Sequence, residues 1–194
     1  SITGNILLSS KYNVDKGFDN MEPIINKNYN KHVLVAFSGP GHNTSQRGHQ
    51  LTIEILIDLI KINKEYLFIV KLHSKDNPIY YQGIDSFKNT ILASEFYSPD
   101  NMPNALEFIK LVDVVITGAS SVGLDALILG KPVISIDPLN ELSHFNYLES
   151  YNVPVIRSKN SLKSLDTVLT SEVKNRKSGF SDITNGTEII KAKI

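Results

Sequence analysis

The chain of 194 residues contains no cysteine, no long apolar run and no excess of charge of either sign. Without cysteine it has no disulfide framework, no thiol nucleophile and no cysteine-based metal site. No apolar stretch approaches the roughly 20 residues that span a bilayer, and no charged-then-apolar leader opens the sequence, so we expect a soluble, cytoplasmic protein. The 20 basic and 20 acidic residues cancel, which argues against a general affinity for nucleic acid or membrane surfaces.

Several common catalytic and cofactor motifs are also missing. There is no Walker A sequence, no G-x-G-x-x-G dinucleotide fingerprint and no G-x-S-x-G elbow of serine hydrolases. The five histidines and the scattered carboxylates show no metal-ligand spacing such as HExxH, so we expect neither a metal nor a required cofactor. What remains is an ordinary globular composition, 41% apolar and 21% charged, which suffices for one domain with a hydrophobic core.

Apolar, β-branched runs alternate with segments of helical periodicity between residues 32 and 170. The expected strands are 33–37, 66–72, 89–96, 112–117, 132–136 and 153–156, and the expected helices include 50–62, 104–111 and 162–169. This alternation predicts an α/β domain with a Rossmann-like, doubly wound parallel sheet of about six strands, in the order 3-2-1-4-5-6, flanked by helices. Residues 1–31 are expected to form a linker or irregular arm, and residues 171–194 a tail with a short helix at 188–193.

The segment 113–137 carries the strongest functional signal in the sequence. It contains an apolar run, a turn with Gly118, Ser120 and Ser121, a short helical stretch, a glycine stop and a second apolar run. A turn of small residues that opens a helix offers backbone N–H groups and hydroxyls with little bulk, which suits a phosphate at a helix N-terminus. The alternative is a tight turn in which a serine only caps the helix. The expected position of this turn in the sheet favours a phosphate site.

A second turn of small residues, with Gly39 and Gly41, follows the first expected strand. By itself it could be a simple break between elements. In the doubly wound order, however, the turns after strands 1 and 4 flank the crevice in which such sheets bind ligands. The two turns therefore predict one binding site.

Three further polar residues are candidates at the same edge of the sheet. His73 directly follows the second expected strand and is a candidate catalytic contact to a phosphate or sugar, unless it only caps the strand end. Asp125 lies about one turn into the helix and is either a ribose acceptor or a solvent-facing residue. Asp137, at the end of the fifth strand, could hold a sugar hydroxyl or start the next turn. The loop histidines His42 and His144 are expected to be solvated.

The segment 113–137 resembles the nucleotide-binding half of the GT-B glycosyltransferases, of UDP-N-acetylglucosamine 2-epimerase and of the capsule and teichoic-acid transferases, including the CDP-glycerol glycerophosphotransferases. Those families follow the Gly/Ser turn with an acidic residue, alanine and Gly-x-Pro-Val-Ile; the matching residues here are Gly118, Ser120, Ser121, Asp125, Ala126, Gly130, Pro132, Val133 and Ile134. Residues 71–73 are similar to the first part of the Lys-x-His-Pro segment of the same group, with Ser74 in place of proline. The Arg-x-x-Thr-Glu-Arg-Pro-Glu run of the epimerases is missing after the fifth strand.

The resemblance implies a donor-binding domain for a UDP- or CDP-linked sugar, spanning residues 32–170. It also implies that an N-terminal acceptor-binding domain is missing. We further expect contacts near residues 95–101 to select the base, and the amides of Ser120 and Ser121 to stabilise the departing diphosphate together with His73. An epimerase-like or CDP-glycerol transferase-like domain is the nearest alternative. Two others are a non-catalytic Rossmann-like assembly module and a small response-regulator-like or flavodoxin-like enzyme. The last lacks its acidic cluster at the end of the first strand, residues 36–38.

Overall fold

The computed structural model describes residues 29–73, 76–98, 101–118, 120–162 and 165–168. Its centre is a sheet of six parallel strands in the order β3-β2-β1-β4-β5-β6. The strands are β1 Lys31–Ala36, β2 Tyr66–Val70, β3 Thr90–Leu92, β4 Val114–Thr117, β5 Val133–Ile136 and β6 Val155–Ile156. The predicted fold class and strand order are therefore confirmed.

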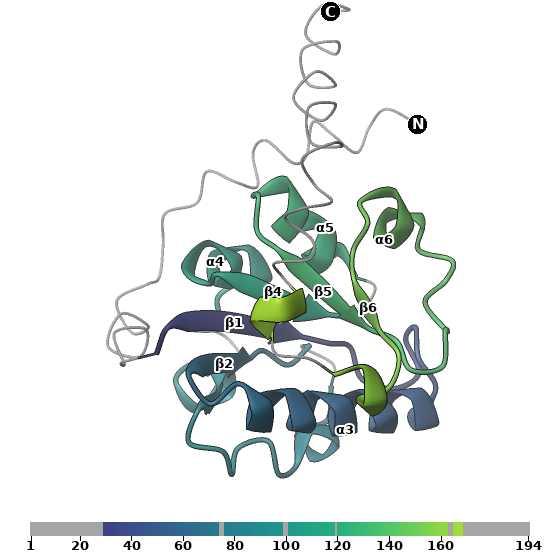
Figure 1. The fold of residues 1–194 in the computed structure, drawn as a ribbon. Coiled ribbons are helices and arrows are strands. Elements are labelled where there is room, and N and C mark those ends of the chain that lie inside the picture. The colour runs from purple at the N-terminus through teal and green to yellow at the C-terminus, as the bar shows by residue number, and fades with distance from the viewer. Residues whose placement is uncertain (1–28, 74–75, 99–100, 119, 163–164, 169–194) are drawn as a thin grey trace, which may run out of the picture.

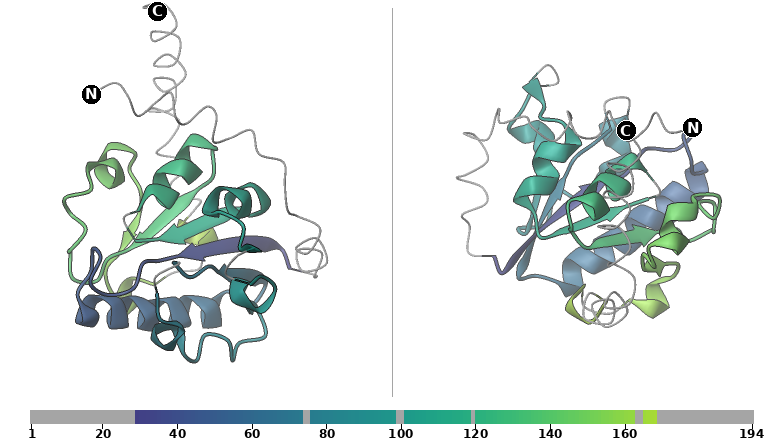
Figure 2. Two further views of the ribbon diagram at one scale, coloured as in Figure 1. Left: turned by 180° about the vertical axis from the view of Figure 1, so that it is seen from behind. Right: turned by 90° about the horizontal axis from the view of Figure 1, so that it is seen from above.

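Helices cover both faces of this sheet (Figure 1). One face carries α3, while α4, α5 and α6 lie over the other, and the views from behind and above in Figure 2 show the same sandwich. The α-helices are α3 Gln46–Ile62, α4 Ala105–Leu111, α5 Ser121–Ile128 and α6 Asn146–Ser150; short 3-10 helices are η1 Pro78–Tyr81, η2 Ala93–Glu95 and η4 Lys159–Ser161. The arrangement makes each strand a buried element with apolar side chains on both faces.

Side chains alternate along β1 between the two faces. Val33 and Val35 join the hydrophobic cluster beneath α3, whereas Leu34 and Ala36 join the cluster beneath α4 and α5. Consecutive strand residues point to opposite faces, so a strand buried on both sides must be apolar at every position. This explains why the strands appear in the sequence as continuous apolar runs.

Several elements differ from the sequence prediction in their bounds. Helix α3 begins at Gln46 rather than at residue 50, because the Ser45 hydroxyl accepts a hydrogen bond from the Gly48 amide and caps the helix. The third strand ends at Leu92, where η2 begins, and the sixth is reduced to two residues. Helix α6 was not predicted. Residues 1–28 of the predicted arm over 1–31 lie outside the described residues, as does the predicted tail over 171–194 with its helix at 188–193, whereas Lys31 begins β1.

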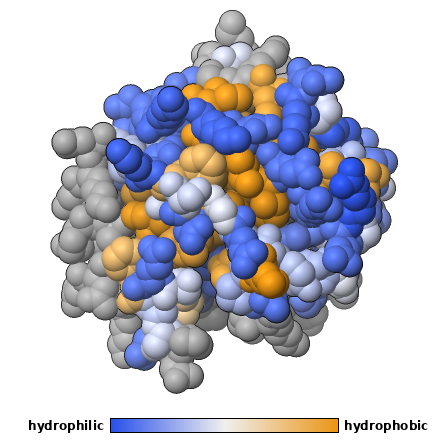
Figure 3. All heavy atoms as spheres, turned by 90° about the horizontal axis from the view of Figure 1, so that it is seen from below, coloured by the Kyte–Doolittle hydropathy of each residue, from blue (hydrophilic) through white to orange (hydrophobic). Residues whose placement is uncertain are grey.

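The surface of the described part is mixed in polarity. Its largest exposed apolar side chains are Ile62, Ile79, Tyr80, Phe96, Ile128 and Leu139. Figure 3 shows that, on the face seen from below, apolar surface is bordered and interrupted by hydrophilic residues. Among the described helices, none combines the length and apolar character needed to cross a membrane.

A buried asparagine ties the end of α3 to the neighbouring strands. The Nδ2 group of Asn89 lies 3.2 Å from each of three carbonyl oxygens, those of Ile60, Asn63 and Tyr66. These carbonyls belong to the last turn of α3, its C-cap and the start of β2, and the Asn63 carbonyl also accepts the Tyr66 amide at 3.1 Å. One side chain thus satisfies the backbone at a buried corner of the fold.

Replacing Asn89 with alanine should remove the side-chain donor from these carbonyls at a buried corner, although the Asn63 oxygen keeps the amide of Tyr66 as a donor. We expect Asn89→Ala to lower the free energy of unfolding by about 1–3 kcal/mol, measured by urea denaturation followed by circular dichroism. Asn101→Ala is the matched control, because Asn101 is exposed and its change should stay within about 0.5 kcal/mol. Equal stability of the two variants would contradict this role for Asn89.

Candidate functional site

A cavity of about 470 Å³ opens at the carboxyl ends of β1, β2 and β4. It lies where the winding of the sheet reverses, because β1 has β2 on one side and β4 on the other. The two turns of small residues after β1 and β4 do meet there. The cavity is lined by Ala36, Phe37, Ser38, His42, Asn43, Lys71, Leu72, His73, Ala105, Ser120, Ser121, Val122 and Phe145.

The first turn of α5 points backbone N–H groups toward this cavity. Ser120 is the N-cap residue, yet its side chain makes no capping hydrogen bond. Its Oγ instead lies 3.0 Å from the Oγ1 of Thr117, which donates to the Ala36 carbonyl. Helix geometry leaves the N–H groups of Ser121 and Val122 without an intrahelical acceptor. These two residues line the cavity, so their amides are placed for an anion.

The Ser120 amide is already engaged inside the protein. The Tyr147 hydroxyl accepts from the Ser120 N–H and donates to the Ser120 carbonyl, both at 3.0 Å. Burial raises the pKa of Tyr147, which keeps this hydroxyl protonated at neutral pH. The contact fixes the turn before α5. The amides available to an anion are therefore those of Ser121 and Val122, whereas the sequence analysis expected those of Ser120 and Ser121.

A half-buried lysine faces the same cavity. Lys71 directly follows β2, and within the described residues no carboxylate pairs with its ammonium group. Burial lowers the pKa of Lys71, because an ammonium group loses hydration there. An anionic ligand would restore the missing counter-charge. In the sequence, Lys71 belongs to the motif at residues 71–73 but is not predicted as a site residue. Which groups surround its ammonium depends on the tertiary fold.

The glycines of the turn after β1 shape the loop rather than line the cavity. The Gly39 amide donates to Asp76 Oδ1 at 2.8 Å, an approach that a side chain on residue 39 would obstruct. Gly41 has a φ of 91°, which glycine adopts at no steric cost, and its amide closes a turn with Thr44. Gly118 borders a small extension of about 20 Å³ beside the main cavity.

The two predicted aspartates lie outside the cavity. Asp125 is buried in α5 and is absent from the cavity wall. Asp137 is 2% exposed, and its two carboxylate oxygens accept the amides of Glu141 and Leu142 at 2.9 and 3.1 Å. Arg157 lies 3.4 Å from Asp137 Oδ2. Asp137 therefore holds the turn after β5, the alternative that the sequence left open.

A second cavity adjoins the first. It measures about 450 Å³ and shares Lys71, Leu72 and His73 with it. Its other walls include residues 94–98, with the side chains of Phe96 and Tyr97. Part of the segment expected to select a nucleotide base therefore lines a cavity that adjoins the first one. Residues 99–100 of that segment lie outside the described residues.

Comparison with known proteins relates the fold to several solved enzyme structures. No family model and no curated protein matches the chain. UDP-GlcNAc 2-epimerase from Neisseria meningitidis, solved with UDP-GlcNAc, superposes with a TM-score of 0.55 at 18% identity, over 80% of this chain and 41% of that one. S. aureus MnaA with UDP gives 0.55 at 16% identity, over 79% and 39%. The wall teichoic acid polymerase TagF gives 0.53 at 20% identity, over 89% and 43%.

These identities support likeness in fold. The neighbours are GT-B fold enzymes, so the resemblance inferred from the segment 113–137 is confirmed at that level. The chain spans less than half the length of each of them.

The two glycines 39 and 118 provide a matched test of the loop geometry. A Cβ on Gly39 would lie 2.8 Å from Asp76 Oδ1, whereas one on Gly118 would meet Leu142 Cδ1 and Phe37 Cδ1 at ordinary distances of 3.4 and 3.9 Å. We expect Gly39→Ala to lower the free energy of unfolding by about 1 kcal/mol or more, because Asp76 must move and the hydrogen bond from the amide of residue 39 is lost. Gly118→Ala should be neutral or stabilising by up to about 1 kcal/mol. Urea denaturation measures both, and equal effects would contradict the close approach of Asp76.

Proposed function

We propose that this domain binds the diphosphate of a nucleotide sugar in the cavity between β1 and β4, as the donor-binding half of a GT-B glycosyltransferase. The observation that carries the proposal is that the uncapped α5 amides and Lys71, which has no carboxylate partner among the described residues, converge on one cavity at the reversal of the sheet. Such crevices are where doubly wound sheets bind nucleotides.

The proposed contacts follow from the charge of a diphosphate. The amides of Ser121 and Val122 and the Ser121 hydroxyl would donate hydrogen bonds to one phosphate, and the Lys71 ammonium would neutralise part of the charge. During transfer, the bond from the sugar to the diphosphate breaks and negative charge builds on the leaving oxygen. Donors already in place stabilise that charge, and His73 is proposed to assist them. Binding by this set does not depend on a metal.

The nucleoside would occupy the adjoining cavity beside Phe96 and Tyr97, which offer apolar and aromatic surface to a base. The neighbouring structures contain UDP-GlcNAc, UDP and, in TagF, CDPG, which supports a UDP- or CDP-linked donor. Asp125 and Asp137 are not included in the contacts, because they are buried outside the cavity. The acceptor and its general base would come from a second domain, so the domain by itself should bind nucleotide without turnover. Its cytoplasmic location stays a prediction.

Calorimetric titration with UDP and CDP tests the proposed function. We expect saturable binding of one nucleotide and a loss of at least tenfold in affinity, about 1.4 kcal/mol, in Ser121→Phe, because the new ring would fill the phosphate position. Ser150→Phe is the matched control, since Ser150 is exposed at the end of α6, away from the cavity. Unchanged affinity in Ser121→Phe, or no binding of either nucleotide, would contradict the proposal and favour a non-catalytic module.

The same titration measures the contribution of Lys71. Lys71→Met keeps the aliphatic stem and removes the charge, so we expect affinity for the nucleotide to fall roughly tenfold. Lys64→Met removes an exposed charge at the far end of α3 and should leave affinity unchanged. Equal affinities of the two variants would show that Lys71 does not contact the diphosphate.

A further inference from the structure

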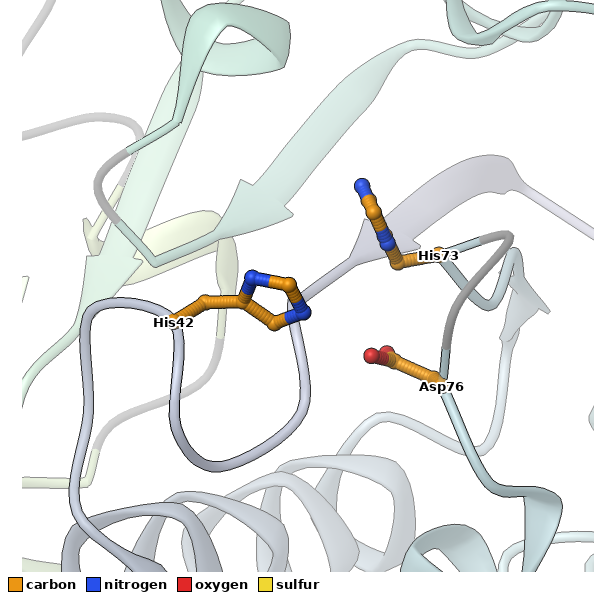
Figure 4. Close-up of side chains that lie close together, drawn as sticks. All are labelled: His42, His73 and Asp76. Atoms are coloured by element: carbon orange, nitrogen blue, oxygen red, sulfur yellow. The ribbon is translucent and has the colours of Figure 1, made fainter.

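Two histidines and an aspartate meet at the rim of the cavity (Figure 4). One ligand atom from each of His42, His73 and Asp76 lies within 4.8 Å of the others. His42 comes from the loop after β1, and the other two come from the segment after β2. Because β1 and β2 are paired parallel strands, their carboxyl ends are neighbours, and residues far apart in sequence meet there.

The carboxylate of this group is held in place by two donors. The Gly39 amide donates to Asp76 Oδ1 at 2.8 Å, and the Tyr81 hydroxyl donates to Oδ2 at 2.9 Å. Each carboxylate oxygen has two lone pairs, so both can still accept a further partner. Outer hydrogen bonds of this kind orient the carboxylates that bind metal ions in proteins.

The two imidazoles can adjust to an ion. The rings of His42 and His73 lie 5.2 Å apart between centroids, inclined at 55°, and both side chains are exposed. Three ligands around a tetrahedral ion, each about 2.0–2.2 Å from it, stand about 3.3 Å from one another. Rotations of two exposed side chains cover the difference, while the anchored carboxylate stays fixed.

We propose that His42, His73 and Asp76 bind a divalent transition-metal ion of the Zn²⁺ type. Two imidazole nitrogens and one carboxylate oxygen form a ligand set that suits Zn²⁺ and its neighbours in the first transition row. Three protein ligands leave a coordination position open. Since His42 and His73 both line the cavity of about 470 Å³, that position faces the space in which a ligand would bind.

The ion has a consequence that rests on the proposed function. It would stand where His73 would otherwise meet the diphosphate, so its charge would replace that of an imidazolium in stabilising the leaving group. Metal binding itself does not depend on a nucleotide. Titration of the metal alone and titration of UDP in the presence of a chelator therefore distinguish failure of this inference from failure of the proposed function.

The test uses the full chain of 194 residues without a histidine tag. We expect calorimetry to show one equivalent of Zn²⁺ binding, and Co²⁺ to give visible absorption bands of a site with nitrogen ligands. His42→Ala, His73→Ala and Asp76→Asn should each weaken Zn²⁺ binding at least tenfold. His144→Ala is the matched control, because His144 is an exposed loop histidine outside the cluster and should leave binding unchanged.

His42→Ala decides the outcome, because Asp76 also supports the loop and its replacement could disturb the fold. Circular dichroism confirms that the variant is folded. Absence of saturable Zn²⁺ binding, or the same affinity in His42→Ala and the parent chain, would overturn the proposal. An equal loss in His144→Ala would reveal binding by scattered surface histidines and would overturn it as well.

Discussion

The reversal of winding between β1 and β4 is the constraint on which the rest of the structure depends. From β1 the sheet grows through β2 and β3 in one direction and through β4, β5 and β6 in the other. The helix that follows β1 crosses one face, and the helix that follows β4 crosses the opposite face (Figure 1). The loops at the two strand ends therefore separate, and no crossover fills the space between them. Each proposed contact lies at the edge of that space.

Local hydrogen bonding differs between the helices α3 and α4 and the helix α5, which faces the cavity. Helix α3 is capped by Ser45, and α4 has a reciprocal capping box between Asn104 and Glu107. Helix α5 has no side-chain cap, because the Ser120 hydroxyl turns toward Thr117. The same region holds a lysine with reduced hydration. A ligand with two or more negative charges would satisfy both features, which is why a diphosphate fits better than a neutral molecule.

Much of this architecture could be predicted from the sequence, since continuous apolar runs and helical periodicity determine the class of sheet and the order of its strands. The sequence analysis placed the start of α3 too late, because residues 46–49 lack the apolar periodicity that indicates a helix. The Ser45 cap nevertheless begins the helix at Gln46. Contacts between segments that are distant in the sequence could not be predicted from it. That Tyr147 holds Ser120, and that His42 approaches His73 and Asp76, depends on loop conformations that no local pattern encodes.

The central claim is that a nucleoside diphosphate binds at the reversal point, and amide NMR of the ¹⁵N-labelled chain during titration with UDP or CDP tests it most directly. The account predicts saturable shifts that are largest for the amides of Ser121 and Val122 and extend to Lys71 at the end of β2. Shifts confined to residues away from these strand ends, or no shifts with either nucleotide, would contradict it.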